Sequence, residues 1–195
     1  NWNSAQTVTI TGADDSLVDG SQTTTITLSV VDGSSDNDFD GVNDQTVSAT
    51  TTDDDTAGFT VTQSDGSTSV DESGSTDTFT VVLDAQPTSD VVLSVSSGDT
   101  GEATVSPATL TFTSGNWDSA QTVTITGAND SLIDGSQTTT ITVSVVDESS
   151  NDSFDSLADQ TVSVSTADDD TAAFTVTQSD GSTSVDESGS TDTFT

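Results

Sequence analysis

The chain has 195 residues, of which 34 are Asp or Glu and none is Lys, Arg or His, so its formal charge is −34. No salt bridge between its side chains is possible. Nucleic acid and anionic membrane surfaces are excluded as partners, because phosphate contacts need Lys and Arg. There is no Cys, and no apolar run reaches the roughly 18 residues that suggest membrane insertion. Any neutralising charge must therefore come from a basic partner or a dissolved cation.

The sequence repeats itself. Residues 1–80 align without gaps with residues 116–195, an offset of 115, and differ from them at 15 positions. A period of this length exceeds a solenoid repeat and suits an independently folding domain. We predict the C-terminal part of one repeat over 1–55, a complete repeat over 56–170, and the start of the next over 171–195.

Within one period, short runs alternate apolar residues with Thr or Ser, as at Phe79, Val81 and Leu83. This period of two is typical of half-buried strands, and no useful helical pattern occurs. Strands are predicted over 58–63, 77–84, 90–97, 108–113, 120–126, 137–146 and 160–166, with Ser69–Asp71 as an extension of the first. Seven short strands predict an all-β fold of tandem seven-stranded immunoglobulin-like β-sandwiches.

Large aromatic residues lie near strand ends at Trp117 and Phe154, with copies at Trp2 and Phe39. We interpret them as core residues that close the ends of the sandwich. A carbohydrate-stacking role is the alternative.

The acidic residues of the complete repeat gather at strand ends. Glu72 precedes the second predicted strand, Glu102 the fourth, and the triplet Asp168–Asp170 follows the seventh. Asp130 and Asp134 lie in the loop after the fifth. Alternate connections of an antiparallel sandwich share one end, so we expect these loops to converge. Oxygen ligands without nitrogen or sulfur favour Ca²⁺, which takes about 6–8 oxygens, over Mg²⁺, and they do not suit Zn²⁺.

The ordered stretches "VDESG", "GEATVSPATLTFTSG", "TVTITGANDSLIDGSQTTTITV" and "DQTVSVSTADDDTA" resemble the Calx-beta repeat. That family is named from sodium/calcium exchangers and is also found in arrays on large bacterial surface proteins. The resemblance covers 56–170 and the partial repeats as far as they extend. It implies a seven-stranded sandwich that binds Ca²⁺ at one end.

By position, the resemblance implies a ligand set for this chain. The set is Glu72, Glu102, Asn129, Asp130, the main-chain carbonyl of Leu132, Asp134, Asp168, Asp169 and Asp170, with copies at Asp14, Asp15, Asp19, Asp53, Asp54, Asp55 and Glu187. Three positions depart from the family pattern. Glu102 stands where the family has Asp, Asn129 replaces an acid that Asp14 keeps, and Asp134 is shorter than the usual Glu. The number of bound ions is therefore left open.

A second acidic stretch covers residues 32–44. Asp36, Asp38, Asp40 and Gly41 imitate the start of an EF-hand loop. The Glu expected at position 12 and the flanking helices are missing, and the second copy loses Asp38 and Gly41. We favour a polar hairpin loop here.

No enzymatic activity is expected. Without His, Cys or Lys, only carboxyl and hydroxyl groups remain for catalysis. A carboxylate pair could cleave glycosides, but that chemistry needs acids in different environments rather than many together.

The sequence predicts a structural segment of a long extracellular or cell-surface fibre or adhesin stalk, stiffened by Ca²⁺ at the junctions between domains. The alternatives are a module that binds glycans or neighbouring fibres and, third, a Ca²⁺ sensor. The expected partners are adjacent repeats of the same chain and identical fibres alongside.

Overall fold

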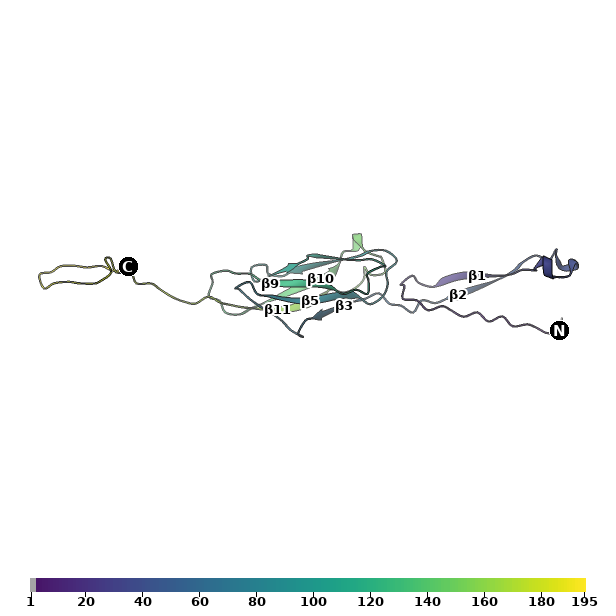
Figure 1. The fold of residues 1–195 in the computed structure, drawn as a ribbon, viewed down its shortest axis with the longest axis horizontal. Helices are drawn as coiled ribbons and strands as arrows, with labels where there is room; N and C mark the ends of the chain where they lie inside the picture. Colours follow the sequence, from purple (N-terminus) through teal and green to yellow (C-terminus); the bar gives the residue numbers. More distant parts are fainter. Residues whose placement is uncertain (1–2) are drawn as a thin grey trace.

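The computed structural model describes residues 3–195, and its central part is a sandwich of two sheets (Figure 1). The five-stranded sheet has the order β4-β11-β10-β6-β8, and the four-stranded sheet has the order β3-β5-β9-β7. The strands are β3 (Phe59–Gln63), β4 (Thr68–Asp71), β5 (Thr76–Leu83), β6 (Val91–Ser97), β7 (Ala103–Ser106), β8 (Thr109–Phe112), β9 (Gln121–Gly127), β10 (Gln137–Val145) and β11 (Gln160–Ala167). A short 3-10 helix, η3 (Asp147–Ser149), lies between β10 and β11.

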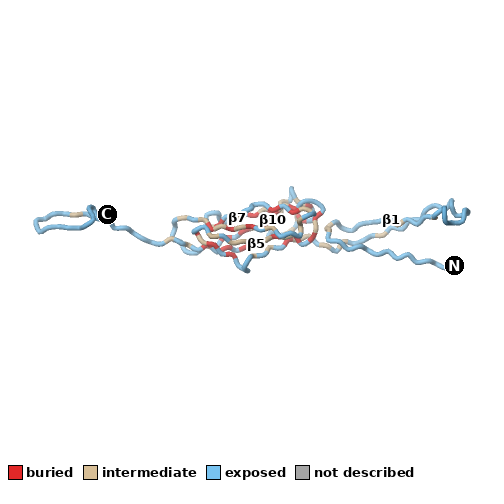
Figure 2. Tube along the Cα trace, in the orientation of Figure 1, coloured by how far each residue is buried: buried red, intermediate tan, exposed pale blue. Residues whose placement is uncertain are grey.

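The core lies between the two sheets and contains the apolar half of each alternating strand (Figure 2). Phe79, Val81 and Leu83 face inward from β5, while Val91, Leu93 and Val95 face inward from β6. Because no ion pair can form, burial of this apolar surface and the strand hydrogen bonds stabilise the unit. The alternation that predicted strands therefore also marks the core.

The unit has nine strands where the sequence predicted seven. The run at Ser69–Asp71 does not extend the first strand, since β4 lies in the opposite sheet from β3. The additional strand β7 was not predicted. Pro107 separates β7 from β8, and the chain changes sheets there. Pro lacks an N–H for the ladder, so it suits such a break between strands.

The N-terminal partial repeat keeps one strand pair but has no sandwich. Strands β1 (Gln22–Leu28) and β2 (Gln45–Thr51) pair with Gln22 opposite Thr51, the register of β10 and β11 one period earlier. Their connection holds two 3-10 helices, η1 (Asp32–Ser34) and η2 (Asn37–Phe39). The hairpin has no second sheet to cover it and is exposed (Figure 2).

The C-terminal partial repeat shows less pairing. Gln178 bridges Phe194, matching the pairing of Gln63 with Phe79 in the complete repeat. Phe174, the copy of Phe59, does not begin a strand and is 90% exposed. A strand start therefore needs the rest of the sandwich. In the described part of the chain, no helix has the length and apolar character to cross a membrane.

The aromatic residues support the core interpretation only where the sandwich is complete. Phe154 is fully buried, and Trp117 is half-buried against the core. Phe39, the copy of Phe154, is 59% exposed because its repeat lacks the opposing sheet. Trp2 lies outside the described residues.

The two copies of this Phe provide a matched test of the core. Phe154→Ala should lower the free energy of unfolding by about 3–5 kcal/mol, because it leaves a cavity between the sheets. Phe39→Ala should change it by no more than about 0.5 kcal/mol, as for exposed positions. Urea unfolding followed by circular dichroism measures both. Equal losses would contradict the assignment of Phe154 to the core.

Candidate metal centre

Glu72 is placed by a parallel pair of strands. The edge strand β4 runs parallel to β11, with Asp71 opposite Ala167, so both strands end at the same end of the sandwich. The Glu72 N–H then donates to the Ala167 carbonyl at 3.1 Å. Glu72 and the triplet Asp168–Asp170 consequently leave neighbouring strands side by side, although about a hundred residues separate them in the sequence.

A close approach of main chains brings the next loop to the same place. Gly127 ends β9, and a Cβ added there would lie 2.0 Å from the Asp71 carbonyl oxygen. Only Gly permits the end of β9 to pass the end of β4 at this distance. The loop after β9, which carries Asp130 and Asp134, therefore begins directly beside Glu72.

Asp168 organises the main chain around the site. Its carboxylate accepts hydrogen bonds from the Gly135 N–H at 2.7 Å and the Asp170 N–H at 2.8 Å. Gly135 has a φ of +72°, which few other residues adopt, and this conformation suits the loop that presents its N–H. These main-chain hydrogen bonds lower the pKa of Asp168, so it stays ionised.

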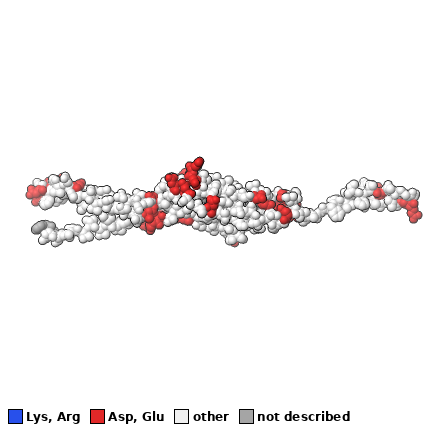
Figure 3. Space-filling model, turned by 180° about the vertical axis from the view of Figure 1, so that it is seen from behind, with Lys and Arg blue, Asp and Glu red and all other residues white. Residues whose placement is uncertain are grey.

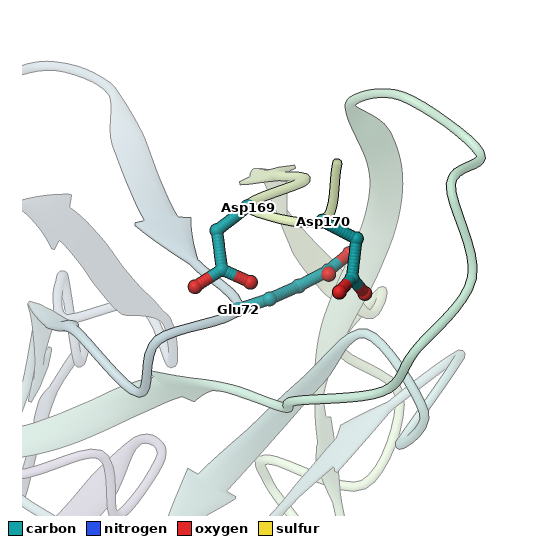
Figure 4. A group of neighbouring side chains, drawn as sticks. All are labelled: Glu72, Asp169 and Asp170. Carbon is teal, nitrogen blue, oxygen red and sulfur yellow. The ribbon is translucent and has the colours of Figure 1, made fainter. Parts of the chain in front are cut away.

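Three carboxylates come together at the end of the sandwich (Figure 4). Oxygens of Glu72, Asp169 and Asp170 all lie within 4.8 Å of one another. Glu72 is only 1% exposed, and its Oε2 has no protein hydrogen-bond partner. Asp170 Oδ2 is also buried without a protein partner. Such groups are costly to bury, which makes this group the strongest candidate for binding a cation.

Glu102, Asp130 and Asp134 lie near enough to Glu72 for their charges to act on its carboxyl group. The Glu102 carbonyl accepts from the Ala128 N–H at 2.9 Å, and the Glu102 Oε2 is buried without a protein partner. Burial raises the pKa of Glu102, and the nearby charges of Asp134 and Asp130 add to the effect. At this end of the sandwich the structure brings together carboxylates that follow β4 and β11, with Glu72 beside Asp169 and Asp170.

The carboxylates of the cluster are desolvated and repel one another. Burial raises the pKa of Glu72, with further contributions from Asp130 and Asp168. Burial also raises the pKa of Asp170, with contributions from Asp169 and Asp168. No cationic side chain exists to relieve this repulsion. A bound divalent cation would relieve it, because ionised oxygens are the ligands that Ca²⁺ takes.

The N-terminal partial repeat contains a separate acidic group at the equivalent sequence positions. Asp14, Asp15, Asp19 and the triplet Asp53–Asp55 line one cavity. Asp53 accepts from the Asp19 N–H at 3.0 Å, from the Gly20 N–H at 2.6 Å and from the Asp55 N–H at 2.8 Å, much as Asp168 does. Acidic groups are visible near this junction and near the opposite end of the sandwich (Figure 3).

The remaining predicted ligands are not members of the group of three carboxylates. Asn129 is exposed, and the Leu132 side chain is 62% exposed while its N–H donates to Asp130 at 2.6 Å. Glu187, the copy of Glu72, is exposed in the C-terminal partial repeat, where no triplet faces it among the described residues.

The acidic stretch 32–44 forms the loop between β1 and β2. Asp36 caps η2 and accepts from the Asp38 N–H at 3.0 Å. Asp36, Asp38 and Asp40 are exposed, as in a polar loop.

Sequence reasoning missed the two features that position the site. It did not identify the parallel pairing of β4 with β11, or the close approach at Gly127. The Gly at the end of the strand "QTVTITG" is the one signal that could have indicated a close main-chain contact.

No model of a known protein family matches the chain, and no curated protein matches it. Similar solved structures include the apo-form Calx CBD1 domain, at 14% identity and a TM-score of 0.39, covering 57% of this chain and 98% of that domain. Domains 4 and 5 of the S-layer protein SbsC have 24% identity and a TM-score of 0.39, covering 65% of this chain and 54% of theirs. SSP-19, an MSP-domain protein like family member in Caenorhabditis elegans, has 15% identity and a TM-score of 0.36, covering 55% of this chain and 97% of its own. These likenesses do not assign the chain to a family.

The raised pKa values predict an acid-dependent gain in stability when metal is chelated. As the pH falls, Glu72 takes up its proton at a higher pH in the folded state than in the unfolded state, where the pKa of a Glu side chain is near 4.5. The free energy of unfolding should therefore rise as the pH falls from about 7 toward 5. Asp168 acts in the opposite sense, but its contribution is lost only as the pH falls below the ordinary value of 3.8.

Urea unfolding in chelator across this pH range measures the gain. Glu72→Gln should reduce it, whereas Glu187→Gln, at the exposed copy, should leave it unchanged. An equal reduction by both variants would indicate relief of the overall negative charge instead.

Proposed function

We propose that this chain is a structural segment of a long extracellular array, in which Ca²⁺ stiffens the junctions between tandem β-sandwich domains. The proposal depends chiefly on one observation: Glu72 is buried with one oxygen that has no protein partner, and its carboxylate lies within 4.8 Å of those of Asp169 and Asp170. A hard divalent cation supplies the positive charge that the chain lacks. The acids present fit Ca²⁺, since they are oxygen donors from several loops with irregular placement.

The position of the cluster supports a mechanical role. The triplet Asp168–Asp170 follows β11 directly, and the chain continues from it into the next copy of the repeat. A cation held by both the triplet and Glu72 would fix the direction in which the chain leaves the sandwich. The triplet Asp53–Asp55 occupies the same place before β3. Ca²⁺ at each such point would turn flexible connections into stiff ones.

The alternative of a glycan-binding module has less support. Among the described residues of the complete repeat, all four Phe are buried: Phe59, Phe79, Phe112 and Phe154. Trp117 packs partly against the core. Ring faces for stacking on sugars are therefore scarce. Partners in the proposed array are the neighbouring repeats and identical fibres alongside, outside the cell.

Ca²⁺ binding to the folded state should stabilise the sandwich by about 2.7 kcal/mol at a hundredfold excess over Kd. The melting temperature should accordingly rise with Ca²⁺ concentration. Asp169→Asn should weaken this rise more than Asp90→Asn. The control variant removes the same charge directly before β6, outside the acidic cluster. Calorimetry with Ca²⁺ and with matched NaCl measures the effect. Equal responses of the two variants would mean that the cation acts by general screening.

Stiffening of the junctions should change the dimensions of a chain that contains several complete repeats in tandem. In chelator, small-angle X-ray scattering should give a broad distribution of maximum dimensions, and Ca²⁺ should narrow and lengthen it. Replacing the triplets by Asn should abolish the change. Identical scattering with and without Ca²⁺ would contradict the hinge part of the proposal, even if the metal still stabilised each domain.

A further inference from the structure

A loop of the N-terminal partial repeat is docked on the complete sandwich. Leu17 forms a parallel bridge with Gln86, which follows β5. The Val18 N–H donates to the Gln86 carbonyl at 3.0 Å, and the Gln86 N–H donates to the Ser16 carbonyl at 2.7 Å. Val18 also packs partly against the sandwich core. Main-chain pairing and an apolar contact thus combine in one short junction.

The receiving side is held in place by its own domain. The Gln86 side chain donates to the Ser114 carbonyl at 2.8 Å, which ties this residue to its own domain. The Gln86 main chain pairs with the incoming loop. Its neighbour Ala85 is only 2% exposed. The receiving segment therefore belongs to the rigid part of the sandwich.

The complete repeat carries the same loop without a receiver. Leu132 and Ile133 are the copies of Leu17 and Val18, and they are 62% and 60% exposed. Leu17 and Val18, in contrast, are half-buried. Both copies keep two large apolar residues between the acids Asp130 and Asp134, or Asp15 and Asp19. Among the described residues of the complete repeat, Leu132 and Ile133 are the large apolar side chains that stay exposed, and two such neighbours indicate an interface.

We propose that the Ser131–Ile133 loop is a docking segment for the following repeat of the same array. Its receiver is position 201, the copy of Gln86 one period of 115 residues later. The occupant follows from the junction already present, since the preceding copy of this loop is seated on that very position of the complete repeat. Each repeat then both receives a loop at one end and offers one at the other.

This docking rests on the array of the proposed function, but its contacts do not include the cation. The two can still influence each other, because the docking residues lie between acids of the cluster. Asp130 accepts from the Leu132 N–H at 2.6 Å, and Asp15 accepts from the Leu17 N–H at 2.9 Å. A cation held by these acids would order the loop before it docks.

The first experiment uses the 195-residue chain and amide hydrogen exchange by NMR. Val18→Ser keeps the N–H but removes the apolar contact, and should raise exchange at the Gln86 amide roughly tenfold or more. Ile133→Ser, the same change in the loop without a receiver, should leave Gln86 unchanged. Unchanged exchange at Gln86 in Val18→Ser, or an equal rise in both variants, would overturn the proposal. Near-ultraviolet circular dichroism checks that the sandwich remains folded.

The second experiment extends the chain after Thr195 with a further copy of residues 81–170, so that the third repeat is complete. With that repeat segmentally labelled, the amide at position 201 should be protected, and Ile133→Ser should remove the protection while Val18→Ser should not. An unprotected amide there, or association of separate chains through Leu132 and Ile133 in sedimentation analysis, would overturn the assignment of the occupant. Exchange is measured in chelator and in Ca²⁺. Protection in both conditions with no Ca²⁺ stabilisation would refute the proposed metal role and leave the docking intact.

Discussion

The parallel pairing of β4 with β11 is the constraint on which both the fold and the candidate site depend. It adds β4 to the edge of the five-stranded sheet, and it makes two strands end together rather than at opposite ends. Glu72 therefore emerges beside Asp168–Asp170, and its N–H is held by the Ala167 carbonyl. An antiparallel edge strand would have directed Glu72 to the other end of the sandwich, away from the triplet.

Two opposing effects act on the ionisation of the acids at this end of the sandwich. Asp168 accepts main-chain hydrogen bonds, which favour its ionised form and tie the Gly135 loop to the end of β11. Glu72 and Asp170 are desolvated without such partners, which disfavours their ionised forms. The metal-free cluster thus combines a fixed scaffold with unrelieved charge. This combination suits reversible binding of a cation. The carboxylates already lie together, and a bound cation would favour their ionised forms and relieve their repulsion.

The partial repeats separate what local pairing achieves from what a complete sandwich adds. The β1–β2 hairpin reproduces the register of β10 and β11, so hairpin pairing needs only the local sequence. Burial does not follow, since Phe39 is exposed where Phe154 is buried. The same comparison distinguishes Val18, which is seated on the sandwich, from Ile133, which is not. Near-identical segments therefore differ in structure because their neighbours differ.

The sequence by itself determined the all-β character, the repeat of 115 residues, the inward-facing residues of the strands, and the grouping of acids in loops at strand ends. Alternation and internal identity are local properties, so they can be read without coordinates. Only the tertiary structure decided that Ser69–Asp71 is a separate strand in the opposite sheet, that β7 exists, and that Gly127 touches the Asp71 carbonyl. It also decided which acids meet, bringing Glu72 to Asp169 and Asp170 while Asn129 stays exposed. These outcomes depend on pairing between segments far apart in the chain, and no local pattern of polar and apolar residues specifies the direction or register of such pairs.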